Sequence, residues 1–96
     1  MTSRNEVLDR AETLINGDRA KEYGSAWENH LRIAAHWSVI FGSPVSVEQV
    51  YQCMIAVKLS RLSETPDHED SWVDICGYAA LGGEGEPMST QSEEHQ

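Results

Sequence analysis

The sequence lacks the long apolar runs that would place the protein in a membrane. No run approaches the roughly 18 residues that a membrane-spanning helix needs. The first residues, Met1 to Glu6, contain no apolar stretch of the kind found in a signal peptide. We therefore expect a cytoplasmic protein with no membrane partner.

Cysteine and basic residues are also scarce. Cys53 and Cys76 are the only cysteines and form no CxxC pair, so we expect buried, reduced thiols and no zinc site. Sixteen acidic residues against seven basic ones give a net charge of −9, and −5 remains without the four acids of the last fifteen positions. Such a chain lacks the basic face that direct nucleic-acid binding needs, whereas a nucleotide accompanied by a divalent cation needs only local positive charge.

Several familiar catalytic patterns are missing too. The chain has no glycine-rich phosphate loop, and its four histidines, His30, His36, His68 and His95, show no HxxxH or HxH spacing. We find no Ser/His or Cys/His arrangement typical of a nucleophile. The histidines are therefore expected on helix surfaces or in packing contacts, and the chemistry has to come from other residues.

Ninety-six residues suffice for one domain with a small core, to which oligomerisation would add burial. Apolar residues recur at helical spacing in four segments, and no segment alternates as a strand would. The capping boxes Ser3-x-x-Glu6 and Ser46-x-x-Gln49 predict two helix starts. We predict an all-α, compact four-helix bundle over residues 1–83, with helices over 3–16, 25–41, 46–63 and 65–81.

The predicted helix ends rest on glycine, threonine and proline signals. Gly17 is expected as a left-handed stop, Gly42 closes the second helix, and Gly82-Gly83 stops the fourth. Thr65 and Pro66 are expected to cap and begin the fourth helix. The third helix has apolar residues around much of its circumference and is expected to be central. Residues 84–96 are acidic and polar and are expected to be a disordered tail.

Charged residues on the third and fourth helices do not fit a plain bundle. Lys58 continues an apolar stripe, and Arg61 lies about one turn further along the same face. Asp70 and Asp74 share a face of the next helix, and an antiparallel hairpin would set Arg61 near Asp70 and Lys58 near Asp74. The four side chains form either structural salt bridges or a cation site in which Lys58 and Arg61 meet substrate phosphates.

Further candidates stand near the start of the second helix and on the fourth. Glu28 is either a third carboxylate for a cation or a first-turn acid favoured by the helix dipole. Arg19, Tyr23 and Asn29 could surround a base or a phosphate, or serve local packing. Trp72 and Tyr78 flank the two aspartates, for stacking on a base or for the core.

Five sequence blocks resemble a group of small phage and prophage proteins described as a domain of unknown function. They are Asn16-Gly17-Asp18-Arg19, Tyr23-Gly24, Glu28-Asn29, the run from Lys58 to Leu62, and the run from Asp70 to Ala80. The resemblance covers about residues 5–83, and the last block is the most specific. The group is similar in layout to the MazG-like, all-α nucleoside triphosphate pyrophosphohydrolases.

This resemblance implies a dimer or tetramer that uses Mg²⁺ to cleave a nucleoside triphosphate to a monophosphate and pyrophosphate. Asp70, Asp74 and Glu28 would hold the metal and act in catalysis with Lys58. The substrate would be bound by a second group of residues: Arg19, Tyr23, Asn29, Arg61, Trp72 and Tyr78. The ExxE pair of the class is missing here, because the position three residues after Glu28 is occupied by Leu31 and not by a second glutamate.

Three functions follow as hypotheses. The first is a Mg²⁺-dependent pyrophosphohydrolase acting on (d)NTPs or a modified nucleotide in the host cytoplasm. The second is a non-catalytic nucleotide-binding or host-interaction protein on the same scaffold. The third is a structural helical homo-oligomer whose charged residues fix its packing.

Overall fold

The computed structural model describes residues 2–17 and 25–87, and within them the chain is all-α. The helices are α1 (Arg4–Asn16), α3 (Ala26–Phe41), α4 (Val47–Glu64) and α5 (Glu69–Glu84). The fold class predicted from the sequence is thereby confirmed for the described residues. Residues 18–24 and 88–96, which include Arg19, Tyr23, His95 and most of the predicted tail, lie outside them.

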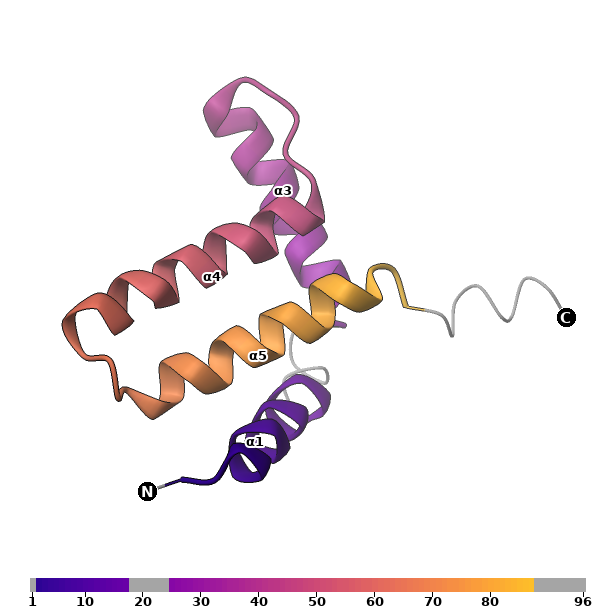
Figure 1. Ribbon diagram of the computed structural model, residues 1–96. Helices are drawn as coiled ribbons and strands as arrows, with labels where there is room; N and C mark the ends of the chain where they lie inside the picture. The colour runs from indigo at the N-terminus through magenta and orange to yellow at the C-terminus, as the bar shows by residue number, and fades with distance from the viewer. Residues whose placement is uncertain (1, 18–24, 88–96) are drawn as a thin grey trace, which may run out of the picture.

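The described helices pack as a series in which α5 lies between α1 and α4, and α4 lies between α5 and α3 (Figure 1). α4 and α5 form an antiparallel hairpin, and α3 crosses α4 near its N-terminal end and continues beyond it. The arrangement is more open than the compact bundle expected from the sequence. α4 is central as predicted, but α5 shares that position with it.

The core lies where α3 crosses α4. Ala34, Val47, Val50 and Tyr51 are buried there, and partly buried residues of α3, α4 and α5 pack around them. The ring of His30 lies tilted against Tyr51 at 4.7 Å between centroids, which makes His30 a packing residue, as expected from the sequence. Burial raises the pKa of Tyr51 to about 12, and the charges of Glu84 and Glu48 add to that rise.

Serine caps begin three of the four helices. Ser3, Ser25 and Ser46 each accept the backbone N–H of the residue three positions on, and that residue's side chain accepts the N–H of the serine. The boxes at Ser3 and Ser46 confirm the sequence predictions. The third, in which Ser25 pairs with Glu28, was not predicted, although its spacing is the same.

Predicted helix ends at Thr65 and Gly17 differ from the structure. Thr65 does not cap the last helix: its N–H donates to Arg61 O at 2.9 Å, so it ends α4 instead. α5 begins at Glu69 after a longer turn, with His68 as an N-cap whose side chain makes no capping hydrogen bond; its Nδ1 lies 2.7 Å from Ser71 Oγ instead. Gly17, expected in the left-handed region, is extended at φ −89°.

Glycines mark the other ends and one close approach. Gly42 has φ +67° and closes α3 as predicted. Gly82 and Gly83 do not stop α5, because Gly82 packs against the ring of Tyr51 and the helix continues to Glu84. Glu84 is therefore helical, not part of a disordered tail. At Gly77, a Cβ would lie 3.1 Å from Ile15 Cγ2, so this glycine lets α1 lie close against α5.

The cysteines are both free. Cys76 is half-buried, but Cys53 lies on the exposed side of α4, so the expectation of a buried thiol is wrong for Cys53. Among the described residues, no helix combines the length and apolar character needed to cross a membrane.

The Ser25 cap gives a first testable prediction. Ser25→Ala should lower the free energy of unfolding by about 1 kcal/mol, because it leaves the Glu28 N–H without its acceptor. Urea unfolding followed by circular dichroism measures this. Ser43→Ala, a matched change at an exposed loop position, should alter stability by less than about 0.5 kcal/mol. Equal losses in the two variants would contradict the capping role.

Candidate functional site

The charged residues that did not fit a plain bundle meet on α5, which lies between a cation from α4 and a cation from α1. Asp70 and Asp74 are one turn apart on α5. Lys58 reaches Asp74 from α4, and Arg10 reaches Asp70 from α1. The packing order of the three helices therefore sets carboxylates of α5 beside a positive charge on each side.

The pair of Lys58 and Asp74 is the less exposed of the two contacts. Lys58 Nζ lies 2.9 Å from Asp74 Oδ2, and their side chains are only 16% and 26% exposed. The pairing predicted from the hairpin is confirmed. Charges held this far from water need each other, because neither can recover its full hydration.

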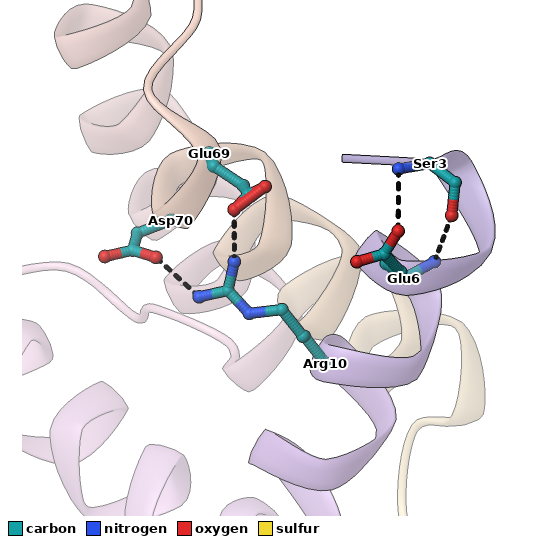
Figure 2. A network of polar contacts seen from close by, with 5 residues as sticks. All are labelled: Ser3, Glu6, Arg10, Glu69 and Asp70. Carbon is teal, nitrogen blue, oxygen red and sulfur yellow. Dashed lines mark hydrogen bonds and ion pairs between the residues drawn. The ribbon is translucent and has the colours of Figure 1, made fainter. Parts of the chain in front are cut away.

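The second predicted pair is wrong, because Arg10 takes the place expected for Arg61. Arg10 Nη2 lies 2.6 Å from Asp70 Oδ1, and its Nη1 lies 2.8 Å from Glu69 Oε2 (Figure 2). Arg61 is exposed and makes no ion pair within the described residues. The longer turn before Glu69 and the packing of α1 on α5 account for the difference.

Arg10 carried a signal that the sequence reading did not use. It follows Val7 by three residues and precedes Leu14 by four, so it borders the apolar stripe of its helix as Lys58 does. What the sequence could not give is the neighbour: nothing in the pattern says that the first helix packs on the last.

Electrostatics confirm that Arg10 and Asp70 act on each other. The hydrogen bond from Arg10 and its positive charge hold the pKa of Asp70 below its usual value. The hydrogen bond to Asp70, with the charges of Glu69 and Asp70, raises the pKa of Arg10. Both side chains are exposed, so the pair is screened by solvent and salt.

A cleft of about 550 Å³ opens between α1 and α5 beside these pairs. This volume lies within the range of small-molecule sites, about 300–1,000 Å³. Seven residues line it, with charged and apolar side chains on both helices: Asp9, Arg10, Thr13 and Leu14 of α1, and Asp70, Val73 and Asp74 of α5; Lys58 is not among them. Asp9, Arg10 and Thr13 were not among the residues expected at the site.

Other expected site residues lie away from this cleft. Glu28 Oε1 accepts the Ser25 N–H at 3.2 Å at the start of α3, so its carboxylate serves a helix cap. Trp72 is exposed, and its indole N–H donates to Pro66 O at 2.9 Å. Tyr78 packs edge-on to His30 beside the core. Asn29 is half-buried on α3, and its N–H donates to Ser25 O.

The donor set does not form a resident metal centre. Among the described residues, no group of three or more His, Cys, Asp or Glu side chains is arranged to hold a metal ion. Glu28, Asp70 and Asp74 are thus not brought together. Asp70 and Asp74 alone match a different mode, in which Mg²⁺ keeps several waters and is held by one or two carboxylates and the phosphates of a ligand.

Fold and site together define a protein that is all-α in its described residues, with an acidic interhelical cleft in which Asp70 and Asp74 are paired with cations from two neighbouring helices. The chain belongs to the family described as a domain of unknown function, DUF6378, whose model matches residues 6–86. The expected relation to a phage family of unknown function is thereby confirmed. Its likeness to the MazG-like enzymes stays a prediction.

Two curated relatives are phage proteins. The Gene 55 protein of Mycobacterium phage L5 is 45% identical over 76 residues, which cover 78% of this chain and 49% of the relative. The Gene 55 protein of Mycobacterium phage D29 is 38% identical over 73 residues, 76% of this chain and 48% of the relative. The chain thus spans about half the length of these relatives. No solved structure matches it significantly.

The Lys58–Asp74 pair predicts a non-additive stability effect. Lys58→Met should lower the free energy of unfolding by about 1–3 kcal/mol, because the half-buried Asp74 carboxylate loses its only ion-pair partner within the described residues. Lys58→Met with Asp74→Leu should recover most of that loss, since removing both charges removes the desolvation penalty. Chemical denaturation measures both. Arg61→Met, on the exposed side of α4, is the control, and a double variant less stable than the single one would contradict the coupling.

The Arg10–Asp70 contact predicts a pH effect. Because the folded pKa of Asp70 is depressed, the contact stabilises the fold above the unfolded value near 3.9, and that stability is lost as pH falls through the folded pKa. Arg10→Met should return the pKa of Asp70 toward its ordinary value. Carboxyl NMR titration measures this shift, and an unchanged Asp70 titration in the variant would rule out Arg10 as its cause.

Proposed function

We propose that the protein binds a metal-complexed nucleotide in the cleft between α1 and α5. The observation that carries this proposal is the mixed charge of the cleft lining, in which Asp70 and Asp74 of α5 occur together with Arg10 of α1, while Lys58 pairs with Asp74 from α4. A cleft lined by charges of one sign would suit an ion of the opposite charge. A cleft lined by both positive and negative side chains suits a ligand that itself carries both charges.

The charges of a nucleotide without a bound metal ion do not match those of the cleft well. Its phosphates carry several negative charges and would meet Asp9, Asp70 and Asp74 as well as the cations. When the phosphates hold Mg²⁺, the ion faces the carboxylates and the phosphate oxygens face Arg10. In this mode Arg10 exchanges Asp70 for the phosphates, Asp70 faces the ion, and Lys58 keeps its contact with Asp74, so none of these charges is left without an opposite one.

The uncharged residues of the cleft suit the base and sugar of a nucleotide. Leu14 and Val73 offer apolar surface, and the Thr13 hydroxyl can donate or accept a hydrogen bond. Neither Trp72 nor Tyr78 lines the cleft, so stacking on a base is not part of the proposal. Arg19 and Tyr23 stay predictions, because they lie outside the described residues.

Pyrophosphohydrolysis is the second candidate, and the similarity in layout between the chain's phage group and the MazG-like class favours it. A bound divalent ion would supply charge neutralisation at the phosphates. In that reading Asp70 and Asp74 face the ion and Arg10 holds the phosphates in place, whereas Lys58, expected from the sequence to meet the phosphates, does not line the cleft. The substrate would be a (d)NTP or a modified nucleotide, as expected for a phage that manages its precursor pool.

Ligand-dependent melting tests the binding proposal. A panel of nucleoside triphosphates with Mg²⁺ should raise the melting temperature, with about 2.7 kcal/mol of stabilisation at a hundredfold excess over the dissociation constant. EDTA should abolish the rise. Asp70→Asn should weaken binding at least about tenfold, as expected when a charge-assisted contact is lost.

The matched control is Asp67→Asn, which makes the same change at an exposed position outside the cleft and should leave binding intact. Equal binding with and without Mg²⁺, equal effects of the two variants, or no binding at all would each overturn the proposal. Release of pyrophosphate and monophosphate tests the second candidate separately. Turnover that is lost in Asp74→Asn while the variant stays folded supports an enzyme, and binding without turnover supports a non-catalytic nucleotide-binding protein.

A further inference from the structure

The C-terminal end of α3 exposes more apolar surface than a surface helix normally does. Val39, Ile40 and Phe41 follow one another in its last turn and are 83%, 71% and 66% exposed. Three consecutive residues point to different sides of a helix, so this turn is apolar nearly all around. A helix that is apolar all around is typically buried.

The position of this turn explains its exposure. α3 crosses α4 near the N-terminal end of α4 and runs on past it, so its last turn lies beyond the helix that covers its middle (Figure 1). Phe41 makes an edge contact with Trp37 of the same helix, at 6.3 Å between ring centroids. The apolar stripe of α3 thus begins in the core and continues beyond it.

The charge distribution favours association at this end. From Asn29 to Ser63 the chain has one acidic residue, Glu48, against the three basic residues Arg32, Lys58 and Arg61, so this segment carries +2 and the rest carries −11. No Asp or Glu occurs between Asn29 and Val47. Two copies that meet at their α3 ends therefore bring few carboxylates together, whereas contact through the strongly acidic remainder brings like charges together.

From the exposed turn and its lack of acidic residues we infer that two copies of this chain pack against each other through the C-terminal ends of α3, in a two-fold symmetric dimer. A two-fold contact places the same patch on both sides, which an uncharged apolar patch satisfies. Residues 39–41 leave on the order of 400 Å² uncovered per copy, about half of the roughly 800 Å² per partner in a standard interface. The contact therefore forms a reversible dimer.

Sedimentation velocity of the full chain tests this inference. The wild-type protein should sediment as a monomer when dilute and increasingly as a dimer as its concentration rises. Ile40→Glu should raise the dissociation constant at least about tenfold, because it sets two carboxylates into an apolar contact. Leu59→Glu is the matched control: Leu59 is 50% exposed on α4, outside the α3 end, and its substitution should leave association unchanged.

The possible outcomes separate the alternatives. A wild-type chain that stays monomeric at every concentration overturns the inference and leaves the exposed turn to a different protein. A dimer that survives Ile40→Glu, or that both variants abolish equally, shows that the contact lies elsewhere. Circular dichroism of both variants checks that each is folded, as substitutions at exposed positions predict.

Discussion

The ion pair between Lys58 and Asp74 is the interaction on which the rest of the site depends. It joins the middle of α4 to the middle of α5 at 2.9 Å, with both side chains mostly shielded from water. Two apolar residues of similar volume at these positions would avoid the desolvation cost of the charges. A chain with so small a core nevertheless keeps a charged pair there, which fits the ligand-binding role proposed for the cleft.

The second pair differs from the first in its exposure, and the contrast describes how the cleft is built. Arg10 holds Glu69 and Asp70 from α1 in an exposed contact that salt weakens (Figure 2). Lys58 holds Asp74 from the opposite side in a sheltered one. Acidic residues in the first turn of α5 also suit the positive end of its helix dipole. The α1 side of the cleft is therefore the side whose charges exchange partners more easily.

The sequence was informative wherever local chemistry decides the structure. Capping boxes, helical periodicity and the stop at Gly42 predicted the helices. The antiparallel packing expected of two helices joined by a short turn predicted the pairing of Lys58 with Asp74. It failed where a choice depends on neighbours that are distant along the chain. Thr65 fits an N-cap locally, but its N–H is already used by α4. Arg10 could be matched to Asp70 only once α1 was known to pack on α5. Glu28 was a candidate metal ligand as a carboxylate near the start of its helix, but its spacing from Ser25 also fits a capping box, and the structure places its carboxylate in the cap.

Gly77 has a consequence for how the cleft could change its width. Because this residue has no side chain, the C-terminal part of α1 touches α5 at Ile15, while the contacts of Arg10 tie the two helices together several residues earlier. The contact of Ile15 with Gly77 thus bounds the cleft at one end, and the ion pairs of Arg10 bound it at the other. Breaking the ion pairs of Arg10 frees only the N-terminal part of α1, because the contact at Ile15 and the packing of α4 on α5 do not depend on them.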